Sequence, residues 1–386
     1  MKATILLCYL KTGGGHYAPA RAIEQHLRYA YPGSVEPILV DGLEGAGSIP
    51  RRILEDGYRL AQSRALWVYE ALYGVTKIRP VARANSALVS RALRRSLEQT
   101  ILRTVPDVIA IFHFFLISPI LDVLRKHHLE VPTITIVTDP FTAHPFWFLR
   151  KDQTMVLFSN ELKQTALRYG LSEEQMQVFP SVLDERVTSA RSHEPACDVR
   201  RTMGFSDDDR IVLLLGGGDG MPRGLKIARA IFRRFPKTAV VLICGRNARL
   251  QKRAAEFARR HPELRLRVLG YVDNAPDLLR IADVVITKAG ASTLMEILAL
   301  GKTPIVTRYI WEQEKGNVDY LLRSHRGIFE PRLRKLPGVL HQLFDGSGDF
   351  HAMKELNSRQ PPEVGTGQVS EYIYNRIQGL VTNMPA

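Results

Sequence analysis

Between Lys288 and Asn317, polar residues fall only where an apolar strand ends or a helix begins. The apolar run from Asp283 ends at Lys288, and four small residues then open a helix. Small side chains let an anion approach the free backbone N–H groups, and the helix dipole favours negative charge there. The turn suits a diphosphate, although a plain tight turn has the same pattern. Its small residues are Gly290, Ala291, Ser292 and Thr293.

Four polar side chains follow this turn at places where they can recognise hydroxyl groups. Glu296 lies one helical turn further on, where a phosphate would repel it and a neutral diol such as a ribose would suit it. The alternative is a carboxylate that complements the helix dipole. After the next apolar run come Gln313, Glu314 and Asn317, whose amides and carboxylate offer directional partners for sugar hydroxyls. The alternative for these three residues is a solvated loop before a helix.

A run of three glycines ends another apolar segment and gives a second candidate phosphate site. Backbone N–H groups in such a turn can close on a phosphate. The run is Gly216, Gly217 and Gly218. It is not a dinucleotide fingerprint, because Met221 or Arg223 occupies the third glycine position, and the sequence has no Walker loop. The alternative is a tight turn in the sheet.

The first half of the chain holds candidates for proton transfer. His16 follows Gly13-Gly14-Gly15 at the start of an expected helix, whose dipole keeps the imidazole neutral and able to accept a proton. It can instead merely hydrogen-bond the turn. Asp139 ends a strand and can act as a base, orient His16 or cap the structure. Trp147 can stack on a ligand or pack in the core.

These residues require a scaffold of parallel sheets. Continuous apolar runs alternate with helical patterns, which is typical of strands buried on both faces. We therefore predict an α/β protein with two doubly wound domains, residues 1–200 and 201–386, divided near Arg200. A final helix can pack back on the first domain, and ligands are expected at the carboxyl ends of the strands, in the cleft between the domains. The predicted strands are 3–10, 107–115, 133–139, 154–159, 210–218, 239–245, 283–290 and 303–308.

Three motifs in order carry a family resemblance. KAGxxTxxE with its QExGN loop, TGGGHYAPARAI near the N-terminus, and TDPFTAHPFWF resemble the glycosyltransferases that build monogalactosyl- and glucosyl-diacylglycerol. More distantly they are similar to the transferase that adds N-acetylglucosamine to the lipid-linked peptidoglycan precursor. The motifs span roughly 300 residues. The resemblance implies a GT-B fold and an inverting transfer of galactose or glucose from a UDP-sugar to diacylglycerol or a glycosyl-diacylglycerol.

The resemblance also implies residue roles. Gly216 to Gly218 and Gly290 to Thr293 would hold the UDP diphosphate, Glu296 the ribose, and Gln313 and Glu314 the hexose. The uracil would lie near Tyr271 and Val272, His16 would be the base with Asp139, and no metal or cofactor is expected. The acceptor side would include Gly14, Gly15, His144 and Trp147.

Composition and charge limit the partners. The net charge of +14 suggests an anionic partner, and residues 51–103 hold eleven Lys/Arg against four Asp/Glu. Within them Leu88 to Leu102 predicts a helix with an apolar side and a basic side, beside Trp67, Tyr69 and Tyr73. This segment can bind an anionic membrane or merely cover the sheet. We expect a peripheral protein at the cytoplasmic face of a membrane. Cys8, Cys197 and Cys244 indicate a reduced protein without disulfides or a zinc site.

Other functions share these features. A UDP-sugar epimerase, or a transferase with another lipid or a soluble acceptor, would need the same donor site. A basic membrane-binding or nucleic-acid-binding protein would need the charge but not the glycine turns. No helix-turn-helix or RNA-binding signature is present, so we expect no nucleic-acid partner.

Overall fold

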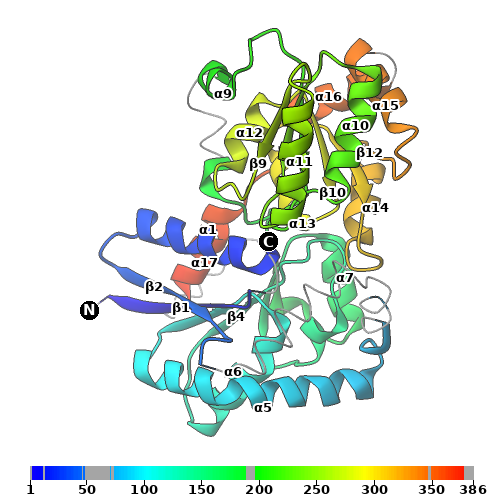
Figure 1. Ribbon diagram of the computed structural model, residues 1–386. Helices are drawn as coiled ribbons and strands as arrows, with labels where there is room; N and C mark the ends of the chain where they lie inside the picture. Colours follow the sequence, from blue (N-terminus) through cyan, green and yellow to red (C-terminus); the bar gives the residue numbers. More distant parts are fainter. Residues whose placement is uncertain are drawn as a thin grey trace. The chain divides into compact units, whose positions relative to one another are not determined.

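The computed structural model describes residues 2–11, 14–45, 47, 70, 74–187, 196–346 and 349–377. The chain forms two compact units (Figure 1). Unit 1 comprises Met1–Asp184 and Val364–Ala386, and unit 2 comprises Glu185–Glu363. The chain thus enters unit 2 at Glu185, whereas the sequence placed the boundary near Arg200. It returns to unit 1 at Val364.

Unit 1 is built on a six-stranded parallel sheet with the order β2-β1-β3-β4-β5-β6. Its strands are β1 (Ala3–Tyr9), β2 (Val35–Asp41), β3 (Val108–Ile111), β4 (Thr133–Ile136), β5 (Thr154–Leu157) and β6 (Met176–Val178). Its helices are α1 (Gly14–Ala30), α5 (Arg79–Thr104), α6 (Phe114–Lys126), η2 (Pro145–Phe148), α7 (Asn160–Arg168), η3 (Glu173–Gln175) and α17 (Thr366–Asn375).

Helices cover both faces of this sheet, because successive side chains of a strand point to opposite faces. Ile5 and Leu7 of β1 pack with α1 and α17. Leu6 and Cys8 pack with α5 and α6, which run side by side (Figure 1). A parallel sheet needs this cover on both faces, and the continuous apolar runs supply it.

Unit 2 repeats the architecture with the strand order β12-β11-β10-β7-β8-β9, all parallel. Val212 and Leu214 of β7 pack with α10, while Leu213 and Leu215 face α12. The strands are β7 (Ile211–Leu215), β8 (Ala239–Ile243), β9 (Leu266–Leu269), β10 (Val284–Lys288), β11 (Pro304–Arg308) and β12 (Ile328–Phe329). The helices are α9 (Ala196–Thr202), α10 (Gly224–Arg234), α11 (Ala248–Arg260), α12 (Ala275–Ile281), α13 (Ala291–Ala299), α14 (Lys315–Arg323), α15 (Leu336–Asp345) and α16 (Asp349–Arg359).

The returning helix α17 is part of the core of unit 1. Val369 and Ile373 are fully buried against α1 and β1, and the rings of Tyr31 and Tyr374 stack with centroids 3.9 Å apart. Gly365 passes so close to Pro180 that an added Cβ would lie 2.1 Å from the Pro180 carbonyl oxygen. Helix α17 therefore completes the packing of unit 1 on this face.

The predicted strands are present, but several end earlier than their apolar runs. The run 107–115 is the clearest case, because β3 ends at Ile111 and α6 begins at Phe114. His113 caps that helix through Nδ1, which accepts from the Phe115 backbone N–H at 3.2 Å. The sequence prediction missed four strands at or near sheet edges, where fewer neighbours demand apolar residues. These are β2, which contains Pro37, β6, β9 and β12.

Both sheets reverse their winding direction beside their first strand. The chain goes from β1 to β2 on one side and then to β3 on the other, so a topological switch point lies between β1 and β3. In unit 2 the switch lies between β7 and β10. Open parallel sheets bind ligands at the carboxyl ends of the strands that flank such a point. We therefore expect ligands to bind at the segments that follow β1, β3, β7 and β10.

Candidate functional site

In unit 2, three segments singled out in the sequence follow neighbouring strands. The glycine turn at Gly216 follows β7, the small-residue turn at Gly290 follows β10, and the loop before Glu314 follows β11. Because β11, β10 and β7 are adjacent and parallel, these segments emerge at one edge of the sheet. The first two flank the switch point. Strand order thus brings together turns that are more than 70 residues apart.

The turn after β10 presents an open helix N-terminus. Gly290 is the N-cap of α13 and supplies no side-chain acceptor for the first backbone N–H groups. Ala291, Ser292 and Thr293 are half-buried. Asn317, which is 3% exposed, donates its Nδ2 hydrogen to the Ala289 carbonyl oxygen at 2.7 Å. Asn317 therefore fixes the backbone of this turn from α14.

Glu314 is also tied to the turn. Its side chain is buried, its Oε1 accepts from Lys288 Nζ at 2.6 Å, and its Oε2 accepts from the Ile310 backbone N–H at 2.9 Å. A Cβ on Gly290 would lie 2.8 Å from Lys288 Nζ, the flexible end of that side chain, which would then have to shift. Both carboxylate oxygens of Glu314 thus have protein partners, and a cation lies beside the helix N-terminus.

The glycine run after β7 combines structural and open positions. A Cβ on Gly216 would lie 2.4 Å from the Gly220 carbonyl oxygen, and one on Gly220 would lie 2.2 Å from that of Cys244. These two glycines let the turn pack against the end of β8, as the tight-turn alternative required. Gly217, with a φ of 77°, has no atom within 4 Å of an added Cβ. Gly218 has only Arg246, at 3.7 Å, so the middle of the turn is open.

The other donor-side candidates lie along the same edge. Tyr271 is 58% exposed, and the Arg246 guanidinium lies 4.7 Å from its ring centroid. Val272 packs on the core of unit 2. Glu296, in α13, and Gln313, in the loop after β11, are half-buried. An exposed aromatic ring next to a guanidinium suits a flat base.

In unit 1, the histidine singled out in the sequence is buried beside a second histidine. His16 lies in the first turn of α1, 8% exposed, and its ring centroid is 4.4 Å from that of His113. Its Nδ1 lies 2.7 Å from Thr138 Oγ1, and the ring donates to the Phe112 carbonyl. Burial lowers the pKa of His16 from 6.5 to about 4, against the weaker opposing effect of that hydrogen bond. The ring is neutral near pH 7 and keeps one lone pair.

His16 also favours the neutral form of His113. Burial, and to a smaller extent the charge of a protonated His16, hold the pKa of His113 well below 6.5. They meet because β1 and β3 are adjacent and flank the switch point. Gly14 and Gly15, in the same helical turn as His16, have no atom within 4 Å of an added Cβ. Gly13 lies outside the described residues.

Asp139 and Trp147 form a pair of their own. The Trp147 indole donates to Asp139 Oδ2 at 3.0 Å, and the ring is fully buried in the core of unit 1. This burial agrees with the alternative in which Trp147 packs in the core. His144 is 4% exposed and caps η2, accepting from the Phe146 backbone N–H, and its Nε2 lies 3.2 Å from Thr76 Oγ1. Asp139, His144 and Trp147 all belong to the segment after β4.

Three residues at these sites were missed in the sequence. Thr138 is the first residue of the TDP motif and Lys288 the first of the KAG motif, so their positions at or just after a strand end were a usable signal. His113 was visible only as the polar residue that interrupts an apolar run. Sequence spacing gave no sign that it lies against His16, because 97 positions separate them.

The basic helix of the sequence analysis is part of α5. Leu93, Leu97 and Ile101 are buried in the core of unit 1, whereas Leu88 is 72% exposed and Ala92 is exposed. Trp67, Tyr69 and Tyr73 lie outside the described residues, as do most positions from 51 to 73. None of the described helices combines the length and apolar character that crossing a bilayer requires. Within the described ranges no group of three or more His, Cys, Asp or Glu side chains is arranged to hold a metal.

Comparison with protein families gives two matches that together contain nearly all of these positions. Residues 16–180 match the family described as monogalactosyldiacylglycerol (MGDG) synthase. Residues 211–316 match the glycosyltransferase family 28 C-terminal domain.

Relatives align over most of the chain. A probable monogalactosyldiacylglycerol synthase of Nicotiana tabacum is 29% identical over 350 residues, 88% of this chain and 64% of the relative. Monogalactosyldiacylglycerol synthase 1 of Arabidopsis thaliana is 28% identical over the same shares. Both are described as chloroplastic. The chain thus spans less than two thirds of these relatives' length.

Solved structures share the fold. Acinetobacter baumannii MurG matches with a TM-score of 0.59 at 15% identity, over 97% of this chain and 100% of that one. Anabaena HepE in complex with UDP gives 0.58 at 13%, over 98% and 100%. A putative UDP-N-acetylglucosamine 2-epimerase of Listeria monocytogenes gives 0.62 at 12%, over 100% and 98%. These likenesses confirm the predicted GT-B fold, which transferases and epimerases share, so the fold alone does not choose between them.

The family matches favour a transferase, since they contain the histidine turn of unit 1 and the three strand-end segments of unit 2 in the expected order: residues 16–180 are similar to the monogalactosyldiacylglycerol synthase family, and residues 211–316 to the glycosyltransferase family 28 C-terminal domain.

Proposed function

We propose that the protein transfers a hexose from a UDP-sugar to diacylglycerol. The match to the monogalactosyldiacylglycerol synthase family supports this reaction, and the relatives' names favour galactose as the sugar. The structural observation that carries the proposal is the open N-terminus of α13 beside the glycine turn after β7, at the switch point of unit 2. That arrangement suits a diphosphate.

The donor roles follow from the geometry of unit 2. The N–H groups of Ala291, Ser292 and Thr293, with Gly217 and Gly218, would hold the diphosphate as fixed dipoles aimed at its negative charge. The Lys288–Glu314 ion pair lies beside them, and release of Lys288 toward the leaving diphosphate would add a positive charge.

The uridine and hexose contacts are assigned to the remaining candidates. Glu296 would take the ribose diol, and Tyr271 and Val272 would line the uracil. Gln313 would contact the hexose. Glu314 and Asn317, whose side chains bond to Lys288, Ile310 and Ala289, would act by fixing the turn.

The acceptor roles follow from unit 1. A neutral His16 can take the proton of an acceptor hydroxyl as that oxygen attacks the anomeric carbon. The C–O bond to UDP breaks as the new glycosidic bond forms on the opposite face, so the anomeric configuration inverts. Thr138 and His113 would orient the ring, and Asp139, which follows Thr138 and accepts from the Trp147 indole, would support that arrangement. Gly14, Gly15 and His144 would border the acceptor.

The exposed side of α5 supports peripheral binding of the protein to a membrane surface. Ala84, Leu88, Arg91, Arg95 and Leu102 fall within one stripe at 100° per residue, and Leu88 and Leu102 are 72% and 45% exposed. Apolar and cationic side chains on one helical stripe suit an anionic bilayer surface. We assign the protein peripherally to such a surface, at the cytoplasmic face, with α5 in contact.

Incubation with labelled UDP-galactose or UDP-glucose and diacylglycerol vesicles tests the proposal. We expect label in a chloroform-soluble product on thin-layer plates, more from UDP-galactose, with a β-linkage by NMR from the α-linked donor. Label that stays in water-soluble sugar would favour a soluble acceptor or an epimerase. No turnover of either donor together with no calorimetric heat from UDP would reject the donor site itself.

A further inference from the structure

A buried glutamine lies behind the segment that carries Trp147. Gln153 directly precedes β5 and is 5% exposed. Its Nε2 donates to the carbonyl oxygens of Trp147 at 2.8 Å and of Arg150 at 2.9 Å. Its Oε1 accepts from Thr135 Oγ1 at 2.7 Å. Both ends of the amide are therefore satisfied by protein groups, and Gln153 joins β4 to the end of η2.

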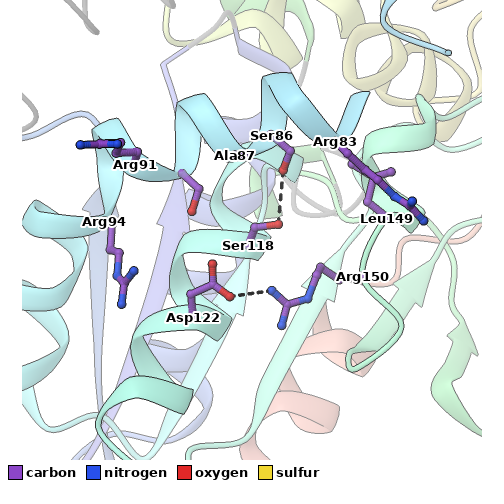
Figure 2. Close-up of a pocket in the computed structure, with 10 residues that line it drawn as sticks. Arg83, Ser86, Ala87, Arg91, Arg94, Ser118, Asp122, Leu149 and Arg150 are labelled. Atoms are coloured by element: carbon purple, nitrogen blue, oxygen red, sulfur yellow. Dashed lines mark hydrogen bonds and ion pairs between the residues drawn. The ribbon is translucent and has the colours of Figure 1, made fainter. Parts of the chain in front are cut away.

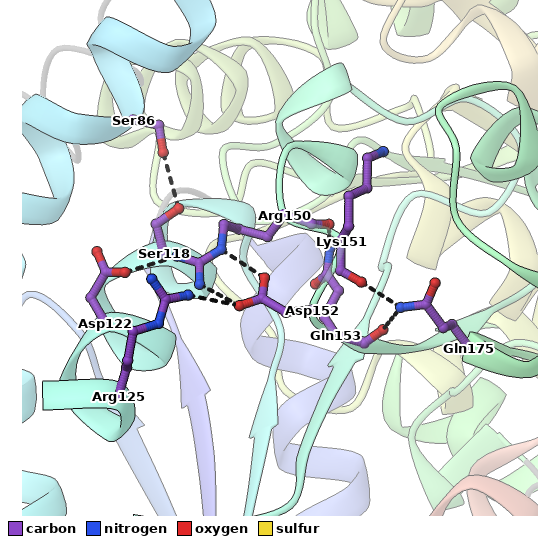
Figure 3. A network of polar contacts seen from close by, with 9 residues as sticks. All are labelled: Ser86, Ser118, Asp122, Arg125, Arg150, Lys151, Asp152, Gln153 and Gln175. Atoms are coloured by element: carbon purple, nitrogen blue, oxygen red, sulfur yellow. Dashed lines mark hydrogen bonds and ion pairs between the residues drawn. The ribbon is translucent and has the colours of Figure 1, made fainter. Parts of the chain in front are cut away.

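Charged residues fix the same segment from another side. Arg150 donates to Asp122 of α6 at 2.8 Å (Figure 2) and, through a second nitrogen, to Asp152 at 2.8 Å (Figure 3). Helix α6 begins after its cap residue His113, whose ring lies against that of His16. The segment after η2 is thus tied to the helix that holds one neighbour of the proposed base.

Trp147 is a second neighbour of the base. Its ring centroid lies 6.2 Å from that of His16, and its indole donates to Asp139 Oδ2 at 3.0 Å. Asp139 in turn follows Thr138, whose hydroxyl lies 2.7 Å from His16 Nδ1. The Trp147 ring is fully buried, so its place depends on tight packing and on its own backbone. A shift of that backbone would displace both the ring beside His16 and the donor to Asp139.

We propose that Gln153 is a positioning residue for the base and that it acts through Trp147. The inference rests on the proposed function, in which His16 takes the proton of the acceptor hydroxyl. General-base catalysis requires the lone pair of His16 to lie at hydrogen-bond distance from that hydroxyl, so a displaced ring lowers the rate without weakening the donor. A glutamine that only stabilised unit 1 would lower the urea midpoint and leave the rate of the folded enzyme unchanged.

The test compares two glutamines of one network. Gln153→Met removes three side-chain hydrogen bonds at nearly constant volume. The control is Gln175→Met, because Gln175 also makes three (Figure 3). Its Nε2 donates to the carbonyl oxygens of Lys151 and Gln153, and its Oε1 accepts from the Ser172 N–H, so its partners do not include Trp147. Gln153→Asn, which keeps the amide on a shorter side chain, gives the same comparison with a smaller perturbation of folding.

Two readouts separate positioning from stability. The first is kcat and KM for UDP-galactose with diacylglycerol vesicles, at a temperature where the urea midpoints show every variant folded. The second is the indole N–H signal of Trp147 in the nitrogen–proton spectrum of the substrate-free protein. The protein has three tryptophans, and Trp147→Phe identifies the signal of this one.

We expect Gln153→Met to lower kcat by about tenfold or more, to change KM by less than about twofold, and to shift the Trp147 indole signal. Gln175→Met should keep kcat within about twofold and leave the indole signal in place. The double variant Gln153→Met/Trp147→Phe should lose no more rate than the more impaired single variant, because both changes act on one element.

Three results would overturn the inference: a wild-type kcat in Gln153→Met, an unmoved indole signal in that variant, or equal losses of kcat in Gln153→Met and Gln175→Met. Rate losses that multiply in the double variant would show that Gln153 does not act through Trp147. The indole signal is recorded without substrate, so it tests the contact separately from the reaction. No transfer by the wild type would instead reject the proposed function, and with it the base to be positioned.

Discussion

Nδ1 of His16 lies 2.7 Å from Oγ1 of Thr138, although 122 positions separate the two residues. His16 opens the helix after β1 and Thr138 follows β4. This contact, with the Phe112 carbonyl, fixes the ring of the proposed base. It gives Thr138 an orienting role that can be tested independently of His16.

Thr138→Val removes the hydroxyl at nearly constant volume. We expect kcat to fall by about tenfold to a hundredfold, because the imidazole loses a hydrogen bond that orients it. KM for the UDP-sugar should not change. Thr138→Ser should restore most of the rate. If Thr138→Val had the wild-type kcat, Thr138 would have no orienting role toward His16.

His16→Ala removes the proposed base itself. We expect turnover to fall by about 10² to 10⁴-fold, which is the usual contribution of a general base. UDP binding by calorimetry should remain, since the donor residues lie in unit 2. His351→Ala, at an exposed position of α16, serves as the matched control. Normal turnover by His16→Ala would make the base assignment wrong.

The buried histidine also predicts a pH dependence of stability. The folded-state pKa of His16 is about 4 against 6.5 when unfolded, so the unfolded chain binds the extra proton between these values. The free energy of unfolding should therefore be unaffected above pH 6.5 and fall by about 3 kcal/mol down to pH 4. The measurement is the urea midpoint across this pH range.

His16→Gln isolates this contribution, because the amide does not titrate. Its urea midpoint should decline less steeply with falling pH than that of the wild type. His113, whose pKa is also lowered, should account for part of the remaining slope. Parallel curves for the two proteins would show that His16 does not titrate as described.

Asn317→Ala tests whether the turn geometry controls donor binding. Loss of the buried hydrogen bond to Ala289 should cost about 1–3 kcal/mol of stability and should weaken UDP binding. The control is Asn357→Ala, which removes another buried amide, bonded to Thr303 and Arg326. It should lower stability by a similar amount and leave UDP affinity unchanged. Equal effects on affinity would mean that general destabilisation is the cause.

Glu296→Ala tests the ribose contact. We expect UDP to bind about tenfold or more weakly, because a charged hydrogen bond to the diol is lost. The substitution should have little effect on the affinity for 2′,3′-dideoxyuridine diphosphate, which lacks the diol. Glu355→Ala, on the surface of α16, is the control. If both nucleotides weaken equally, Glu296 acts on the helix and not on the ribose.

The sequence alone predicted much of the fold and the identity of the strand-end turns. Apolar runs define the strands because a parallel strand buried on both faces requires them, and small residues at positions 290–293 identify a turn through local sterics. The GGGH, TDP and KAG segments needed no tertiary information to be singled out.

Only the tertiary structure decided which of these residues meet. His16 touches His113 because the winding of unit 1 places β1 beside β3, and apolar periodicity carries no information on strand order. Likewise, the sequence suggested sugar contacts for Glu314 and Asn317, and their hydrogen bonds to Lys288 and Ala289 became visible only in the structure. Local sequence determines which groups stand at a strand end. Their partners depend on burial and on long-range neighbours, which exist only once the sheet is assembled.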